Sequence, residues 1–153
     1  MAYECDVKDL SAQPTLAIRT RTSVQELSRV LGEAYGAIAQ YIGELGEQFA
    51  GPPYVAYYNE DMEDLDLEIG FPVTRELPGE GDIQASEIPA GKVATCLHTG
   101  PYSDVEPAYN ALGHWIEENG YEPTGVAYEM YPNDPDETPT EELQTQIMFP
   151  VRS

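Results

Sequence analysis

The chain has 153 residues, of which 41% are apolar, and its 28 acidic residues against seven lysines and arginines give a formal net charge of -21. The length fits one domain, or two small half-domains that share a core. Charge of this sign repels phosphate backbones and anionic membrane surfaces, so we expect neither direct nucleic-acid binding nor membrane binding. No stretch is apolar and long enough for a membrane helix, and the N-terminus lacks the pattern of a signal peptide. The sequence therefore predicts a cytoplasmic protein, whose acidic surface reflects either a salt-rich cytoplasm or a protein partner.

The first segment with a clear pattern, residues 14–22, alternates apolar and polar side chains and predicts a strand. Ser23 followed by Glu26 predicts a capping box at the start of a helix. Gly46 marks the end of that helix. Between these points the apolar residues recur at helical spacing: Leu27, Leu31, Ala34, Ile38, Ile42 and Leu45.

Two more strands are predicted at residues 54–58 and 65–72. In the second, apolar residues alternate with Asp66, Glu68 and Gly70, which predicts one buried face and one wet face.

The same order of elements then recurs. Residues 83–87 and 92–98 predict a pair of strands, and Gly100-Pro101 interrupts the chain. Asp104 is the predicted cap of a second helix, which Asn119-Gly120 ends. The closing strands are predicted at residues 125–131 and 143–150.

Matching residues support a duplication. Ala34-Tyr35, Ile38 and Tyr41-Ile42 have the same spacing as Ala108-Tyr109, Leu112 and Trp115-Ile116, and Ile69-Gly70-Phe71-Pro72-Val73 resembles Ile147-Met148-Phe149-Pro150-Val151. We therefore predict an α+β fold, a tandem β-α-β-β repeat with pseudo-two-fold symmetry, an antiparallel sheet, two long helices and a central cleft. The expected division is an N-terminal extension over 1–13 and a domain over 14–151, with repeats at about 14–78 and 79–151. A duplicated fold with a filled core and no cavity is the alternative.

The repeat singles out one acid. When Val55-Ala56-Tyr57 is aligned with Val126-Ala127-Tyr128, Tyr58 falls opposite Glu129. Glu129 lies in an otherwise apolar strand, and its same-face neighbours are Ala127 and Tyr131. A buried carboxylate must be paired, protonated or open to a ligand, because burial of an unpaired charge is costly. We interpret Glu129 as the anchor for a cation surrounded by aromatic rings; an acid on the solvent side of an edge strand is the alternative.

Other candidates are weaker. Trp115 and Tyr41 lie beside the apolar stripes of the helices and are typical of core residues, and Tyr102 either lies over the groove or covers a helix start. Cys5 and Cys96 form no metal motif, and His98 and His114 have no partners at metal spacing, so we expect no metal and no cofactor.

The chain resembles the GyrI-like small-molecule-binding family, the effector-binding domain of AraC-type and MerR-type multidrug regulators and of gyrase-inhibitory proteins. The resemblance covers about residues 14–151 and rests on a set of spaced motifs: His98-Thr99-Gly100-Pro101-Tyr102, then Ala108-Tyr109, Leu112 and Trp115-Ile116, Glu129-Met130-Tyr131 with Asn133-Asp134-Pro135, and Thr145 to Pro150.

The resemblance implies that Glu129 anchors cationic, lipophilic ligands in the central cleft. The aromatic residues that it implies for the lining of the cleft are Tyr58, Tyr102, Tyr131, Trp115 and Phe149. Unlike the regulators, this sequence leaves only thirteen residues before the first predicted strand, too few for a helix-turn-helix. We therefore expect a stand-alone binding domain for amphiphilic, cationic or drug-like molecules.

Two alternatives stay open. Some stand-alone members of the family are hydrolases that open cyclopropane-containing genotoxic compounds. Here Glu129 would be the general base, with Tyr58 or Tyr102 donating to the leaving group. The third hypothesis is an acidic inhibitor of a DNA-handling enzyme, which would make a protein the partner.

Overall fold

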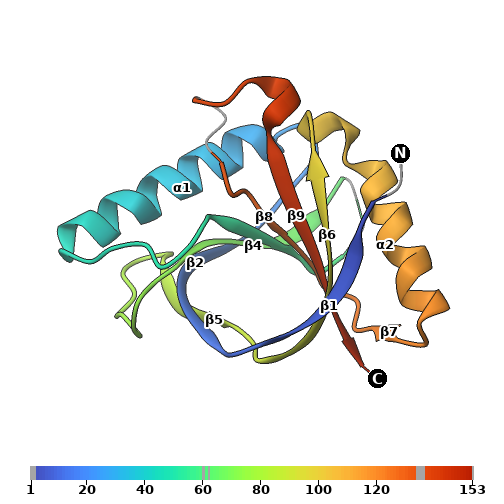
Figure 1. Ribbon diagram of the computed structural model, residues 1–153. Coiled ribbons are helices and arrows are strands. Elements are labelled where there is room, and N and C mark those ends of the chain that lie inside the picture. Colours follow the sequence, from blue (N-terminus) through green and yellow to red (C-terminus); the bar gives the residue numbers. More distant parts are fainter. Residues whose placement is uncertain (1–2, 60, 62, 134–136, 153) are drawn as a thin grey trace. The chain divides into compact units, whose positions relative to one another are not determined.

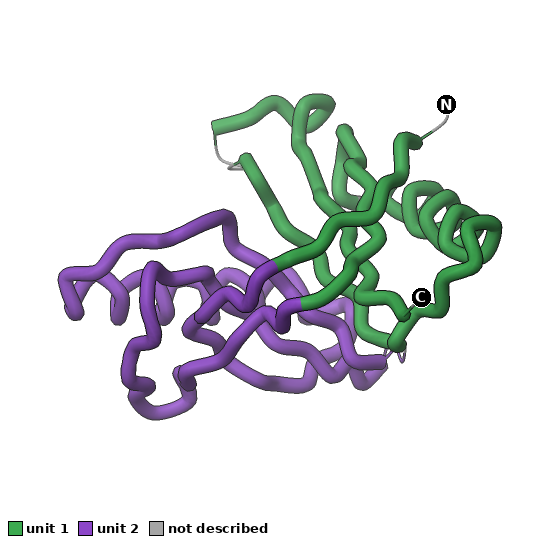
Figure 2. The backbone as a smooth tube through the Cα atoms, turned by 60° about the horizontal axis from the view of Figure 1, so that its bottom comes forward, with its two compact units in different colours: residues 1–10, 91–153 green, residues 11–90 purple. Residues whose placement is uncertain are grey.

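The protein divides into two compact units. The structure, a computed structural model, describes residues 3–59, 61, 63–133 and 137–152. Unit 1 comprises residues 1–10 and 91–153, and unit 2 comprises residues 11–90 (Figure 2). Asp134 and Pro135, which carry part of the family resemblance, lie outside the described residues.

In its described residues, unit 2 contains four antiparallel strands and one helix. Along the chain these are β2 (Gln13–Thr22), α1 (Leu27–Glu44), β3 (Tyr54–Tyr57), β4 (Leu65–Pro72) and β5 (Gln84–Ile88) (Figure 1). The strands are arranged in the order β5-β2-β4-β3. Directly paired residues lie on the same face of an antiparallel sheet, and the pairing of Leu16 with Phe71 places both on the face that α1 covers.

The core of unit 2 lies between α1 and this face of the sheet. It is a cluster of buried side chains that comprises Leu16, Ile38, Tyr41, Ile42, Val73, Leu77 and Ile83. Helix α1 ends at Glu44, and Gly46 shortly after it has a φ of 71°, a left-handed conformation that glycine adopts without strain. The amide of Glu47 donates to the carbonyl of Ile42 across this end.

Unit 1 has the same strand–helix–strand–strand core. Its main elements are β6 (Gly91–Thr99), α2 (Glu106–Glu118), β8 (Ala127–Met130) and β9 (Gln144–Arg152). The N-terminal strand β1 (Cys5–Leu10) pairs with β6, and the sheet order is β1-β6-β9-β8. Shorter elements are β7 (Glu122–Pro123), which pairs with β9, and two 3-10 turns at Tyr102–Asp104 and Thr140–Glu142.

The core of unit 1 lies beneath α2, which runs beside β1 and β6 in Figure 1. Its buried members are Ala94, Cys96, Ala108, Leu112, Ile116, Ile147 and Val151. None of the helices in the described part of the chain has the length and apolar character needed to cross a membrane.

The α+β fold class is confirmed, and most predicted strands agree with the structure to within one or two residues. Two predictions about pairing or extent need revision. The segment before Pro14 contributes strand β1 to the sheet of unit 1. Strand β5 pairs with β2 rather than with β6, because β1 and β9 occupy the two edges of β6.

Both predicted helix caps are wrong. The amide of Glu26 donates to the carbonyl of Ser23 in a separate turn, so α1 begins at Leu27 without a side-chain cap. Asp104 belongs to a 3-10 turn, and α2 begins at Glu106, followed by Pro107 in its first turn. Proline is well tolerated there because the first amides of a helix lack intrahelical acceptors.

Candidate ligand-binding site

Glu129 lies on the helix-covered face of the unit 1 sheet. It pairs directly with Ile147 of β9, and Ile147 packs in the core beneath α2. Since paired residues share a face, the carboxylate of Glu129 is directed to the side of the sheet that carries α2. The side chain is partly buried there. Within unit 1, the side chain of Glu129 therefore does not lie on the face of the sheet opposite α2.

Two tyrosines donate hydrogen bonds to this carboxylate. The hydroxyl of Tyr109 on α2 donates to Oε2. The hydroxyl of Tyr131, two residues along the chain from Glu129, donates to Oε1 at 2.8 Å. Each carboxylate oxygen therefore has one phenolic donor, and a carboxylate has room for about four.

Aromatic rings extend outward from the two tyrosines. The ring of Tyr102 packs edge-on against Tyr131, with 5.4 Å between centroids. The ring of Phe149 packs against Tyr109 at 5.7 Å. Tyr102 keeps 36% of its surface exposed, so this end of the cluster is accessible to solvent. The sequence-predicted residues Glu129, Tyr131, Tyr102 and Phe149 thus lie in one connected cluster, joined through Tyr109.

The charge of Glu129 has no basic counterpart in the described part of the chain. Among the residues that the structure describes, no lysine, arginine or histidine forms an ion pair with it. Burial raises the pKa of Glu129 above its ordinary value, and the hydrogen bonds from Tyr109 and Tyr131 lower it in part. The carboxylate is therefore partly desolvated and only partly compensated by neutral donors.

The sequence alignment predicted that Tyr58 is the counterpart of Glu129, and the pairing of the strands shows that it is not. In unit 2, Val55 pairs with Ile69, as Glu129 pairs with Ile147 in unit 1. The repeated segments that contain Ile69 and Ile147 therefore place Val55 at the position of Glu129. The alignment of the two Val-Ala-Tyr segments was displaced by three residues relative to the pairing of the strands.

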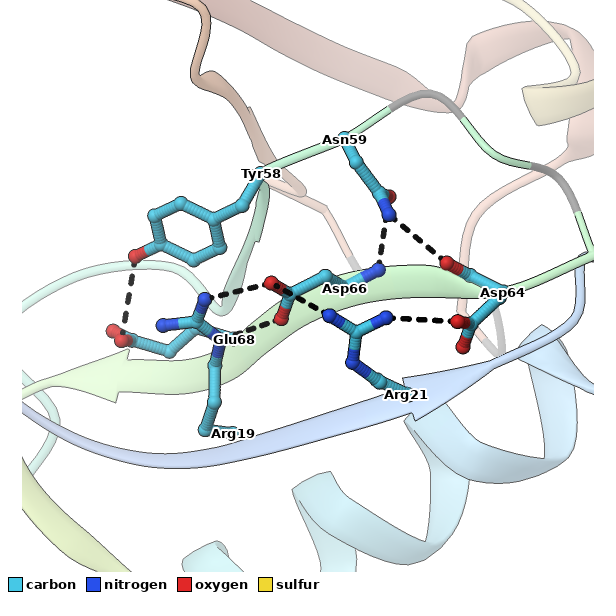
Figure 3. A network of polar contacts seen from close by, with 7 residues as sticks. All are labelled: Arg19, Arg21, Tyr58, Asn59, Asp64, Asp66 and Glu68. Carbon is cyan, nitrogen blue, oxygen red and sulfur yellow. Dashed lines mark hydrogen bonds and ion pairs between the residues drawn. The ribbon is translucent and has the colours of Figure 1, made fainter.

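Tyr58 instead belongs to a polar network on the face of the unit 2 sheet opposite α1 (Figure 3). The guanidinium of Arg19 lies 3.9 Å from the centre of its ring. The same guanidinium binds both carboxylate oxygens of Asp66, at 2.7 and 2.9 Å. Arg21 bridges Asp64 and Asp66.

Glu68 is a second partly buried carboxylate, which the sequence pattern assigned only to a wet face. Its Oε1 accepts hydrogen bonds from Tyr54 at 2.7 Å and Ser86 at 2.9 Å, and its Oε2 accepts a long one, 3.5 Å, from Tyr58. Arg19 pairs directly with Glu68 across the two strands. Unlike Glu129, Glu68 therefore has a basic register partner, and its charge interacts with that of the Arg19 guanidinium.

The two remaining candidates pack within their units. Tyr41 is 9% exposed in the core of unit 2, and its hydroxyl donates to the carbonyl of Pro78. Trp115 stacks on Tyr121 at 6.1 Å and packs against the unit 1 core. Neither contacts Glu129 through any interaction that the described residues show.

A shallow cavity of about 270 Å³ beside α2 is lined by Gly113, Ile116, Glu117, Tyr121, Glu122, Pro123 and Phe149.

Tyr109 is the residue of the cluster that sequence reasoning did not select. It appeared only as a member of the repeated helical pattern, next to the buried Ala108. A usable signal was present, because Tyr109 matches Tyr35 in the first helix, and a tyrosine at the edge of an apolar stripe needs a partner for its hydroxyl.

Comparisons with known proteins identify the family and the fold. The profile of the GyrI-like small molecule binding domain matches residues 3–152. No curated protein sequence matches the chain. The crystal structure of the C-terminal domain of EcmrR is 25% identical, with a TM-score of 0.85, and the match covers 100% of this chain and 99% of that domain. In the EcmrR–DNA complex, which is 24% identical with a TM-score of 0.87, the match covers all of this chain but 59% of EcmrR.

Two more distant structures share the fold. A hydrolase from Listeria innocua is 13% identical, with a TM-score of 0.70 over 99% of this chain and 93% of the hydrolase. SAV2435 bound to tetraphenylphosphonium is 14% identical, with a TM-score of 0.69 over 100% of this chain and 95% of SAV2435. The family match spans nearly every residue, including the elements that bring Glu129, Tyr109 and Tyr131 together. The chain therefore belongs to the GyrI-like small molecule binding domain family.

Proposed function

We propose that this domain binds amphiphilic organic cations and that Glu129 of unit 1 supplies the electrostatic anchor. The observation that carries the proposal is a partly buried carboxylate held by two neutral hydroxyls and by no cation among the described residues. A cationic ligand would supply the missing charge, and attraction between opposite charges is stronger away from bulk water.

The rings around the carboxylate support the second half of the proposal. Tyr102 and Tyr131 offer π-faces and ring edges next to Glu129. A cation over such a face gains roughly 0.5–2 kcal/mol, and apolar parts of a ligand gain from burial against the rings. The net charge of -21 also attracts cations over longer distances at low ionic strength. SAV2435, which shares the fold, was captured with the lipophilic cation tetraphenylphosphonium.

Calorimetric titration with tetraphenylphosphonium tests the proposal, with triphenylphosphine oxide as the uncharged ligand of similar shape. The Glu129→Gln variant keeps the size and one acceptor oxygen of the side chain but removes its charge. We expect at least a tenfold loss of affinity for the cation, equivalent to about 1.4 kcal/mol. Affinity for the uncharged ligand should change much less.

Glu118→Gln is the matched control, because Glu118 is an exposed acid at the end of α2 in the same unit. It removes the same charge from the molecule but not from the cluster, and should leave affinity nearly unchanged. Circular dichroism would verify that each variant is folded. If both variants lost the same affinity for the cation, the loss would reflect non-specific electrostatic attraction and not binding at Glu129. If Glu129→Gln kept the wild-type affinity, the anchor role would be excluded.

A hydrolase is the second candidate function, and one observation favours it. Burial raises the pKa of Glu129, and a carboxylate with a raised pKa is a stronger general base for a water molecule. Tyr102 lies one ring away and is 36% exposed. Hydrolase activity is tested by incubating the protein with a cyclopropane-containing alkylator. Mass spectrometry then detects the product, which has gained the mass of one water molecule. Turnover that Glu129→Gln abolishes would favour the enzyme; binding without turnover would favour the receptor.

A further inference from the structure

Cys5 and Cys96 lie directly opposite each other on neighbouring antiparallel strands of unit 1. They are register partners in the β1–β6 ladder, and both are free cysteines. Residues paired in this way have Cα atoms about 4.5–5.5 Å apart, within the range of about 4.4–6.8 Å that a disulfide requires. The two thiols are close enough for each to influence the pKa of the other. They are the only cysteines of the chain, so each has no other intramolecular partner.

The two thiols differ in their access to solvent. Cys96 is 2% exposed and belongs to the buried core beneath α2. Cys5 is only partly buried and packs against the edge of that core. A reagent in solution can therefore reach Cys5, whereas Cys96 is sheltered and lies directly opposite Cys5 on the neighbouring strand.

We propose that Cys5 and Cys96 form a redox modification site, at which a hydroperoxide or a small-molecule disulfide converts the two thiols into an intramolecular disulfide that joins β1 to β6. With a hydroperoxide, the thiolate of Cys5 attacks the peroxide, so that an S–O bond forms and the O–O bond breaks. The sulfur of Cys96 then attacks the sulfur of Cys5, so that the S–S bond forms and the S–O bond breaks. Two thiols are oxidised and one molecule of hydrogen peroxide is reduced to two waters.

With a small-molecule disulfide, Cys5 first forms a mixed disulfide and releases one thiol. Cys96 then attacks the sulfur of Cys5 and releases the second thiol. The order of the two cysteines follows from their surroundings. Burial raises the pKa of both thiols, that of Cys96 to about 12, while the hydrogen bond from Cys96 favours the thiolate of Cys5. Cys5 is therefore the attacking group, and the reaction should accelerate as the pH rises.

The consequence of the bond follows from its place in the chain. Strand β1 lies at the end of the strand order and pairs with β6. The segment between the two cysteines contains all of unit 2. Closing so long a loop reduces the conformational freedom of the unfolded chain considerably. Oxidation should thus fasten the N-terminal strand and stabilise the protein, with a rise in Tm of about 10 °C.

The test treats the whole protein with oxidised glutathione or hydrogen peroxide at several pH values. The protein is then unfolded, alkylated and weighed by mass spectrometry. We expect the wild type to lose the mass of two hydrogen atoms, to accept no alkylating group, and to remain monomeric on a non-reducing gel. A proteolytic digest should contain one peptide pair that joins Cys5 to Cys96.

Two variants separate the steps. Cys96→Ser should stop at a stable glutathione adduct on Cys5, because no second thiol displaces it. Cys5→Ser should keep Cys96 as a thiol under the same conditions. The proposal is wrong if the wild type retains both thiols, if disulfides form only between molecules, or if Cys96→Ser acquires no adduct. If oxidation left the Tm of the wild type unchanged or lowered it, the expected stabilisation by the disulfide between β1 and β6 would be contradicted.

Discussion

Tyr35 and Tyr109 occupy matching positions on α1 and α2, but their hydroxyls reach different acceptors. Each tyrosine packs against the matching phenylalanine of the neighbouring sheet, Phe71 or Phe149. The hydroxyl of Tyr35 donates to the backbone carbonyl of Tyr54 at 2.9 Å, whereas that of Tyr109 donates to the side chain of Glu129. One change at the matching strand position, from Val55 to Glu129, thus turns a structural contact into part of a charged cluster.

This relationship predicts how the pKa of Glu129 changes when the hydroxyl of Tyr109 is removed. Tyr109→Phe removes a donor that stabilises the ionised carboxylate, so the pKa of Glu129 should rise further. The measurement is an NMR pH titration of the carboxyl carbon in protein with labelled glutamate. Tyr35→Phe, which removes the matching hydroxyl of unit 2, should leave this titration unchanged. A pKa that stays constant or falls in Tyr109→Phe would show that the hydrogen bond does not favour the charged form.

The raised pKa of Glu129 also predicts how stability depends on pH. Between the unfolded pKa, which is near the ordinary value of 4.5, and the higher folded pKa, the folded state binds the proton more strongly than the unfolded state does. The contribution of this group to stability is therefore present below the unfolded pKa and is lost as the pH rises through the folded pKa.

Glu129→Gln removes this contribution. The Tm of the variant minus that of the wild type should be near its lowest value below pH 4.5 and should increase to a plateau at higher pH. Calorimetric scans of both proteins between pH 4 and pH 8 would measure it. If the Tm of the variant minus that of the wild type fell as the pH rose, the charged form of Glu129 would be the one that stabilises the fold.

Gly70 is predicted to tolerate no side chain. A Cβ atom there would lie 2.7 Å from the carbonyl oxygen of Leu16 and 2.9 Å from the ring of Tyr54, so Gly70→Ala should reduce the free energy of unfolding by about 1–3 kcal/mol. Gly36→Ala is the control, because a Cβ atom at this exposed position of α1 meets nothing within 4 Å. That change should stabilise the helix by about 0.5–1 kcal/mol. Urea denaturation measures both, and equal effects would refute the steric argument.

The network around Glu68 predicts unequal effects for two tyrosines. The hydroxyl of Tyr54 lies 3.0 Å from the buried Thr15 Oγ1 and 2.7 Å from Glu68, so Tyr54→Phe leaves buried polar groups without this partner. We expect a loss of about 1–3 kcal/mol in the free energy of unfolding. Tyr58→Phe removes only a contact of 3.5 Å to Glu68 and should cost less. If Tyr58→Phe proved the more destabilising change, the hydrogen bonds to Tyr54 would not be the main support of Glu68.

The sequence by itself determined both long helices, most of the strands and the order of these elements. The apolar period of about 3.6 residues located α1 and α2, and alternation located the longer strands, because each pattern reflects the geometry of one element and one buried face. The same reasoning directed attention to Glu129, since an acid amid apolar strand residues is costly unless a specific arrangement accommodates it.

Only the tertiary structure decided which residues meet. The register of β3 and β8 against their partner strands matched Glu129 to Val55 and not to Tyr58. Short identical segments could not reveal this, because register is set by contacts between residues far apart in the chain, and a slip by an odd number of residues moves every side chain to the other face. For the same reason, the pairing of Cys5 with Cys96 and the donors around Glu68 became visible only when the strands lay side by side.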